Sequence, residues 1–384
     1  MNNVSSLELL NNCTGCCACL NICPKGAITI IKNERGFYNP SVSENCIDCG
    51  LCNSVCQITD RPQANKIKFV VAGKSNNLNI RMKSSSGGLF FEVCNFLNEK
   101  YNGNISFWGA AWAKDHYSLS HEKRSFETIQ DLHGSKYVQS FIGYAFSEIA
   151  NLLQQGQYVL FSGTGCQCAG LVKYLKAKNV LYDKLFIIDV ICHGVPSQQL
   201  WEDYIRLIEK KNKAKIVKYS FRDKNVSWHG IHPLVITDSH QTIFPDKLVC
   251  SYGKLFANTS LNEKCYECDY TNTNRIGDIT LGDFWGIETT HKYLDDGKGV
   301  SICLVNTHKG ESIISELTKY VNIVNVNDDT FLQPNLQHPT KRNLRQKKFW
   351  NDYMKHGYLY VAKKYTMHSK ISSMLYKVYK SIKR

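Results

Sequence analysis

The sequence lacks any long apolar run and any leader-like start. Its longest apolar stretch, residues 185–192, is far shorter than the about 20 residues that span a bilayer as a helix, so we expect no membrane-spanning segment. The first twelve residues, MNNVSSLELLNN, contain neither a basic stretch nor an apolar core. We therefore expect no secretory signal and a cytoplasmic protein.

Acidic residues are scarce at one end of the chain. From Lys341 onward there are thirteen Lys and Arg and one acid, Asp352, so this segment carries +12 of the net charge of +14. Because the rest of the chain is nearly balanced, we expect no nucleic-acid partner. A helical stripe in this segment could contact an anionic membrane surface or a partner protein, whereas packing on its own domain is the favoured alternative. The stripe consists of Ile371, Met374, Leu375, Val378 and Ile382.

Cysteine, by contrast, is abundant. There are 17 cysteines, and without a signal this density indicates metal ligands in a reducing compartment rather than disulfides. Eight of them form two C-x2-C-x2-C-x3-C runs, which are Cys13, Cys16, Cys19, Cys23 and Cys46, Cys49, Cys52, Cys56. This spacing is typical of ferredoxins with two [4Fe–4S] clusters.

In such ferredoxins each run lends its fourth cysteine to the other cluster. We therefore assign the first cluster to Cys13, Cys16, Cys19 and Cys56, and the second to Cys46, Cys49, Cys52 and Cys23. A pair of zinc knuckles is the alternative, but zinc sites use two C-x2-C pairs rather than interlocked fours. Cys17 is an extra thiol inside the first run.

The chain divides into four predicted parts of an α+β protein. Residues 1–60 form a ferredoxin-like domain with a short hairpin, residues 68–155 and 156–330 form a larger α/β domain, and residues 331–384 form a basic helical tail. Strands over 158–161 and 185–191, with a helix over 168–178 between them, predict a βαβ unit with parallel strands.

A further cysteine set gathers around that unit. Cys166 and Cys192 follow the two strands, at the edge where open α/β sheets bind ligands. Together with the C-x2-C pair Cys265 and Cys268 they could close a third [4Fe–4S] site. The alternative is two core cysteines plus a zinc or redox pair.

A serine–glycine turn, residues 84–88, precedes an apolar helix pattern. Free backbone N–H groups and hydroxyls at such a turn suit a phosphate or pyrophosphate, and an ordinary helix cap is the alternative.

In combination these motifs resemble the coenzyme F420 hydrogenase/dehydrogenase beta-subunit family. The matching segments are SSSGG at 84–88, GSKYVQS at 134–140, GTGCQ at 163–167, CHGVPS at 192–197, FRDK at 221–224, the pair Cys265 and Cys268, and DITLGDFWG at 278–286. Gly165 stands where the family usually has proline.

The resemblance implies a flavin, normally FAD, beside a [4Fe–4S] cluster, which favours the third cluster. It implies flavin or substrate contacts at Ser86, Gly87, Gly88, Ser135, Lys136 and Tyr137. Lys136 and Arg222 are candidate partners of a phosphate or of flavin N1, where a cation stabilises reduced flavin. His193 is a candidate proton donor, and the alternative is a histidine that is only hydrogen-bonded in its loop.

The chain looks closest to a branch of the family associated with bacterial polysaccharide biosynthesis, so coenzyme F420 itself is not the expected substrate. We expect an iron–sulfur flavoprotein oxidoreductase that passes electrons from a ferredoxin-like donor or partner redox enzyme, through clusters, to a flavin and an unidentified acceptor. The alternative is a non-catalytic electron-transfer subunit that carries only clusters for a partner enzyme.

Overall fold

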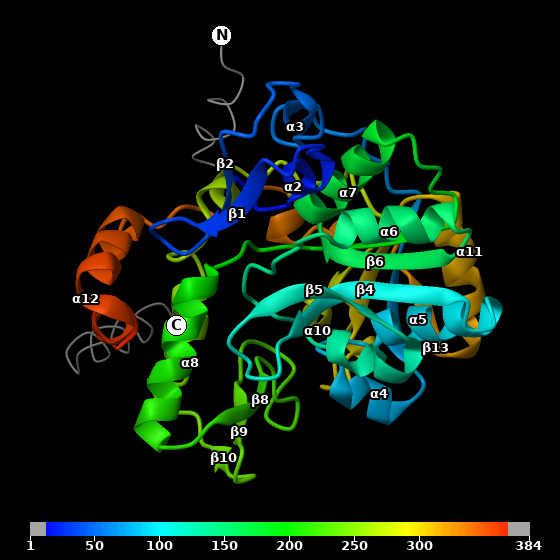
Figure 1. The fold of residues 1–384 in the computed structure, drawn as a ribbon. Helices are drawn as coiled ribbons and strands as arrows, with labels where there is room; N and C mark the ends of the chain where they lie inside the picture. The colour runs from blue at the N-terminus through cyan, green and yellow to red at the C-terminus, as the bar shows by residue number, and fades with distance from the viewer. Residues whose placement is uncertain (1–12, 368–384) are drawn as a thin grey trace.

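The computed structural model describes residues 13–367, and a large mixed sheet forms its centre (Figure 1). The eight strands lie in the order β13-β3-β12-β11-β7-β6-β4-β5. β4, β6, β7 and β11 run parallel, and the other neighbours pair antiparallel. The bounds are β3 Phe69–Ser75, β4 Ile105–Trp112, β5 Leu119–Arg124, β6 Tyr158–Thr164, β7 Leu185–Val190, β11 Ile279–Asp283, β12 Ser301–Val305 and β13 Val321–Asn325.

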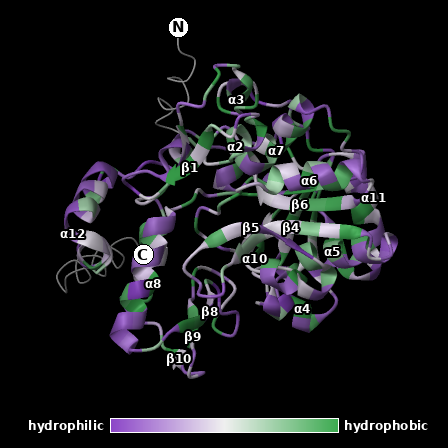
Figure 2. Cartoon of the chain, viewed as in Figure 1, coloured by the Kyte–Doolittle hydropathy of each residue, from purple (hydrophilic) through white to green (hydrophobic). Residues whose placement is uncertain are grey.

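Helices cover both faces of this sheet, so its central strands are apolar on both sides. On β6, Val159 and Phe161 pack in one core beside α6 (Ala145–Gln154) and α7 (Gly165–Ala177), whereas Leu160 packs in another beside α5 (Leu89–Lys100) and α11 (His308–Glu316). Figure 2 shows the hydrophobic colouring of these central strands. The result is a three-layer α/β arrangement.

The β6-α7-β7 unit has the predicted parallel strands, but its boundary differs from the prediction. β6 continues to Thr164, and α7 begins at Gly165 rather than at Cys168. The cause is a capping box, in which the Thr164 and Gln167 side chains and backbone bond one another reciprocally. Cys166 therefore lies in the first turn of a helix instead of in a loop.

Residues 13–60, which we call the N-terminal module, lie against α6 and α7 (Figure 1). The module contains α2 (Ala18–Ile22), β1 (Ile28–Lys32), β2 (Tyr38–Val42) and α3 (Leu51–Ser54). β1 and β2 pair antiparallel, as the predicted hairpin requires.

A second subdomain packs beside the large sheet. It has a small antiparallel sheet of β8 (Ile216–Ser220), β9 (Leu234–Thr237) and β10 (Thr242–Ile243), with α8 (Gln198–Asn212), α9 (Ser251–Phe256) and α12 (Gln346–Thr366). The short helices α4 (Leu78–Lys83) and α10 (Ile287–Thr290) complete the α-helices among the described residues.

Helix α12 lies within the segment predicted to be a basic helical tail. Phe349, Trp350 and Val361 of this helix are buried in the core that α8 and β8 also form. Up to residue 366, the basic segment therefore packs on its own domain. The stripe from Ile371 to Ile382 lies outside the described residues. No helix within residues 13–367 is long and apolar enough to cross a membrane.

Candidate functional site

The cysteines assigned to the first cluster lie together in the N-terminal module. The Cys13 thiol interacts electrostatically with the thiols of Cys16 and Cys56, and the Cys19 thiol with all three. Burial, reinforced by these neighbours, raises the pKa of Cys13 to about 12 and that of Cys16 to about 11. A thiolate at this position thus requires a compensating positive charge, which a metal centre supplies.

The cysteines assigned to the second cluster surround a small cavity. It has a volume of about 30 Å³, and its lining, which comes entirely from residues 23–52, includes Cys23, Cys46, Cys49 and Cys52. Cys49 is exposed, so this end of the module lies at the surface.

The two cysteine runs share one backbone shape. Gly15 and Asp48, two residues after the first cysteine of each run, have φ of 72° and 52°. Cys17 and Gly50, which lie two residues later in each run, also adopt the left-handed backbone conformation, with φ of 58° and 73°. In both runs the residue at the first of these positions donates its N–H to the leading cysteine, at 3.3 Å for Cys13 and 3.5 Å for Cys46. The repeat thus directs a backbone N–H at the first thiol of each run in the same way.

The extra thiol of the first run, Cys17, is only 2% exposed and donates to the carbonyl of Gly15. It belongs to the hydrophobic core, as do the remaining buried cysteines, which are Cys94, Cys168 and Cys303. Cys250 is partly exposed, and all 17 cysteines are free thiols.

Cys166, Cys192, Cys265 and Cys268 come together from three separate segments of the chain. The thiol of Cys265 interacts with those of the other three, and desolvation raises its pKa well above the ordinary value. Backbone N–H groups of Gly194 and Tyr270 donate to Cys192 and Cys268 at 3.4 and 3.5 Å. Within residues 13–367, no three His, Cys, Asp or Glu side chains converge closely enough to hold a single metal ion.

A buried ion pair holds this third set in place. Arg275 and Asp189 are each 1% exposed, with 3.3 Å between Nη2 and Oδ1. The Arg275 guanidinium also donates to the carbonyls of Tyr270 at 2.6 Å and Val190 at 3.1 Å. Because Val190 precedes Cys192 by two residues and Tyr270 follows Cys268 by two, Arg275 ties the two cysteine-bearing segments together.

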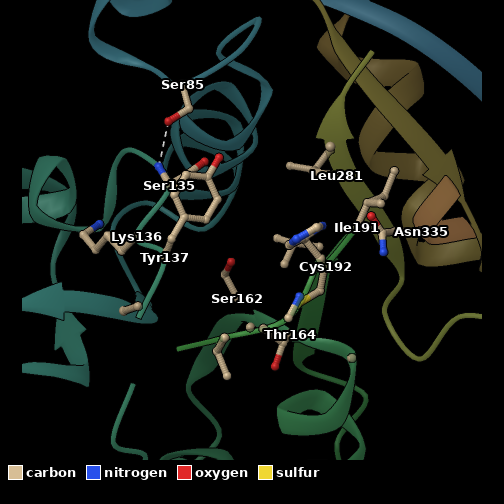
Figure 3. Close-up of a pocket in the computed structure, with 18 of the residues that line it drawn as sticks. Ser85, Ser135, Lys136, Tyr137, Ser162, Thr164, Ile191, Cys192, Leu281 and Asn335 are labelled. Atoms are coloured by element: carbon tan, nitrogen blue, oxygen red, sulfur yellow. Dashed lines mark hydrogen bonds between the residues drawn. The ribbon is translucent and has the colours of Figure 1, made fainter. Parts of the chain in front are cut away.

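These four cysteines form part of the wall of a large cavity. Its volume is about 770 Å³, and it opens at the carboxyl ends of β6, β7 and β11. Figure 3 shows Ser135 and Tyr137 on one side facing Ile191, Leu281 and Asn335 on the other, with Ser162 and Thr164 between them. This is the ligand-binding edge of a parallel sheet, and the volume suits a cofactor or substrate.

Most of the predicted contact residues line this cavity, namely Ser86, Gly88, Ser135, Lys136, Tyr137, His193 and Arg222. Gly87 does not line it. Its N–H donates to Ser301 Oγ at 2.9 Å, and a side chain there would collide with the Gly73 carbonyl, so this glycine permits close packing. Ser135 N–H donates to Ser85 Oγ at 2.7 Å, which joins the two predicted segments (Figure 3).

The two predicted cations differ in their pairing. Arg222 donates to both Asp283 oxygens at 2.8 and 2.9 Å and is 3% exposed, so its charge is balanced within the protein. Lys136 donates only to the carbonyls of His133 and Gly134, at 2.7 and 3.3 Å. Desolvation lowers the pKa of Lys136 to about 7. Lys136 is therefore the cation that an anionic ligand would stabilise.

His193 is engaged on both sides of its ring. Nε2 bonds the Ala257 carbonyl, and Nδ1 lies 3.3 Å from Thr340 Oγ1. Since the Ala257 carbonyl can only accept, Nε2 carries a proton, and the Thr340 hydroxyl donates to the His193 carbonyl oxygen at 2.6 Å. This geometry fits the alternative of a histidine that is hydrogen-bonded in its loop.

The sequence motifs did not point to His121, which also lines the cavity. Its ring nitrogens bond the Ser162 carbonyl at 3.1 Å and Ser140 Oγ at 3.0 Å, and Gln167 Nε2 donates to Ser140 at 2.9 Å. Burial lowers the pKa of His121 to about 4, so the ring stays neutral at pH 7. No local signal could have found it, because its role arises from the pairing of β5 with β4.

Comparison with known proteins finds a family model that matches the middle of the chain. Residues 156–329 match the family model for the C terminus of the coenzyme F420 hydrogenase/dehydrogenase beta subunit. This match, over just under half of the chain, is to the beta-subunit family. The resemblance drawn from the sequence is thereby confirmed, and all four cysteines of the third set lie within the matched residues.

Two curated relatives and one solved structure are similar to the chain. The F subunit of the F420H2 dehydrogenase of Methanosarcina mazei is 24% identical over 310 residues, 74% of this chain and 81% of that protein. An uncharacterised ferredoxin of Methanocaldococcus jannaschii is 39% identical over 44 residues, 12% of this chain and 57% of the ferredoxin. A structure of the xenon-derivatised F420-reducing [NiFe] hydrogenase complex from Methanosarcina barkeri covers 79% of this chain and 92% of its own, with TM-score 0.47 and 17% identity.

Proposed function

We propose that this chain is an iron–sulfur flavoprotein subunit of an oxidoreductase. The observation that carries the proposal is the placement of Cys166, Cys192, Cys265 and Cys268 on the wall of the 770 Å³ cavity. A one-electron centre held there would adjoin whatever binds in the cavity. The family match and the ferredoxin relative support a redox role for the chain.

The residues present fit iron–sulfur clusters. The thiols are free, the two N-terminal runs repeat one left-handed backbone pattern, and backbone N–H groups point at thiol sulfurs in all three sets. When bound, the clusters supply one-electron transfer. The proposed ligands are those assigned from the sequence, four cysteines to each cluster.

The cavity also fits a flavin such as FAD. When bound, a flavin couples one-electron transfer to hydride transfer. The Ser85 hydroxyl and the backbone N–H groups at the start of α5 can donate to a phosphate, whereas the Ser84 and Ser86 hydroxyls donate to the Ile80 and Val300 carbonyls. Lys136 supplies an unbalanced positive charge, whereas Arg222 and Asp283 together offer a fixed, neutral pair. The neutral His121 holds Ser140 and the β6 end in place.

Coenzyme F420 is the first hydride partner to test, because the Methanosarcina mazei relative is named as part of an F420H2 dehydrogenase. A role in polysaccharide biosynthesis, which the sequence resemblance favoured, is a second proposal for the pathway. Because that relative is one subunit among others, we also propose a partner redox enzyme or ferredoxin-like protein as the one-electron donor.

Anaerobic purification followed by iron, sulfide and flavin analysis tests the proposal. We expect about twelve irons and one flavin per chain. About eight irons without flavin would overturn it and favour the second candidate, a subunit that carries only clusters for a partner enzyme. Reduction of F420 or another hydride acceptor by the isolated, flavin-loaded chain would separate the two candidates further.

A further inference from the structure

The segment that carries Cys265 and Cys268 also holds the N-terminal module. Residues 262–275, which we call the joint, contact the module or its linker at five places. These are Asn262 Nδ2 to the Cys13 carbonyl at 3.1 Å, Glu263 with Arg35 at 2.6 Å, Asp269 with Arg61 at 3.2 Å, Tyr270 with Gln57 at 2.5 Å, and a backbone bridge between Arg275 and Asn65 at 2.7 and 2.8 Å.

Tyr270 and Gln57 lie at the centre of this contact. The Tyr270 hydroxyl donates to Gln57 Oε1, and Gln57 Nε2 donates to Thr14 Oγ1 at 2.9 Å. Gln57 is only 1% exposed and directly follows Cys56 of the first set. Tyr270 in turn donates its N–H to Cys268 of the third set. A continuous chain of bonds therefore joins the two cysteine sets.

Helix α7 makes a second connection between the same two sets. Cys166 lies in its first turn, and a Cβ placed on Gly170 would lie 3.0 Å from the Cys16 sulfur. Four residues of helix span about 6 Å. The Cys16 thiol, which faces Gly170, therefore lies roughly one helical turn along α7 from Cys166. A Cβ on Gly165 would lie 2.8 Å from Tyr270 Cβ, so the ring of Tyr270 packs directly on the start of α7.

The second cysteine set does not share this proximity to the third set. The cavity that its four cysteines line draws its walls only from residues 23–52, and Cys49 is exposed. By contrast, Thr14 of the first run lines the large cavity together with the third set.

We propose that the joint is a positioning element that fixes the first cysteine set beside the third, with Tyr270 and Gln57 as its central contact. The inference rests on the proposed function, since it assumes that clusters occupy both sets. It assigns the first set as the immediate electron-transfer neighbour of the third, and the second set as the more remote one facing the surface. Each transfer moves one electron between clusters and breaks no covalent bond.

Electron paramagnetic resonance of the fully reduced protein tests this order. We expect the signal of the third cluster to be split by a neighbouring spin. Cys56→Ser, which removes a ligand of the first cluster, should abolish the splitting, whereas the matched Cys46→Ser, in the second set, should leave it. The opposite pattern would overturn the inference.

Tyr270→Phe tests the central contact, because it keeps the ring and removes only the hydroxyl. We expect unchanged iron content and a weakened splitting. Tyr353→Phe is the control, since it removes a hydroxyl bond to Asp203 at 2.7 Å outside the joint, and it should change neither. Arg61→Ala, which removes one exposed ion pair of the joint, should weaken the splitting less than Tyr270→Phe.

The outcomes separate the two proposals. Full iron content with a splitting that Tyr270→Phe leaves intact would overturn the role of the joint alone. A wild-type protein with only about eight irons would overturn the proposed function, and the inference with it.

Discussion

Arg275 is the residue on which the third cysteine set depends most. Its guanidinium is buried, pairs with Asp189, and bonds carbonyls on both cysteine-bearing segments. An arginine suits this position because its planar group donates in several fixed directions at once. A lysine could neutralise Asp189 but could not reach all of these acceptors.

Replacing Arg275 by Met should therefore be costly. Removing one partner of a buried pair leaves an uncompensated charge, so we expect a loss of about 3–5 kcal/mol in the free energy of unfolding, together with the iron of the third set. Denaturant unfolding of the metal-free protein and iron analysis are the measurements. Arg81→Met is the control, because its partner Asp296 is 37% exposed and the loss should be smaller. Equal losses would contradict this role.

Lys136 gives a prediction for pH. Burial lowers its pKa to about 7, so the side chain is charged below that pH and neutral above it. If the charged form binds an anionic flavin, affinity should fall as pH rises through 7, by up to about tenfold per pH unit. Lys136→Arg should keep the affinity nearly constant, because arginine stays charged. Flavin fluorescence titrations over this range measure the effect, and a wild-type affinity independent of pH would contradict it.

At the scale of elements, α7 connects two parts of the molecule. Its first turn holds Cys166, and one turn later Gly170 faces Cys16 and Phe146. Glycine within a helix is destabilising relative to alanine by about 0.5–1 kcal/mol. The close approach of the Cys16 sulfur explains its presence here, because a larger side chain would displace the first cysteine run.

Gly170→Val should therefore disturb the first set selectively. We expect overpacking to lower the free energy of unfolding by about 1–3 kcal/mol and the iron of the first set to be lost, while the second set keeps its iron. Gly170→Ala adds only the Cβ that would lie 3.0 Å from the Cys16 sulfur, so it should cause a smaller loss of the same kind. The measurements are thermal unfolding and iron content, and full iron content in the valine variant would show that the module adjusts freely.

At the scale of the whole molecule, the N-terminal module and the large sheet share one hydrophobic core. Leu20, Ile22 and Val55 of the module pack in the same cluster as Phe146 and Leu171 of the large domain. The module is thus part of the folded body rather than a tethered domain, although its cysteine spacing is that of an independent ferredoxin.

A chain that begins after residue 64 should consequently expose the apolar surface of α6 and α7. We expect it to aggregate or to bind a hydrophobic dye, and to unfold at a lower temperature than the full chain. Size-exclusion chromatography and thermal unfolding are the measurements. A monomeric truncated chain with an unchanged unfolding temperature would contradict the shared core.

Local spacing in the sequence was enough for several features. The cysteine runs, the βαβ unit and the Ser84–Gly88 turn are contiguous patterns, and such patterns report local backbone geometry. The parallel pairing of β6 and β7 follows because a strand–helix–strand unit has one favoured hand. The predicted start of α7 is wrong because the reciprocal capping of Thr164 and Gln167 begins the helix three residues earlier, at Gly165.

Other features were decided only by the tertiary structure. Cys265 and Cys268 reach Cys192 because Arg275 draws distant segments together, and no spacing rule encodes that contact. Which side chains become buried together decides three further features. Arg222 pairs with Asp283, Lys136 donates to backbone carbonyls rather than to an acid, and His121 is neutral. The sequence by itself determined which chemistry the thiols can support, because ligand type and spacing are local. The structure decided which thiols adjoin the cavity, because that depends on contacts between residues far apart in the chain.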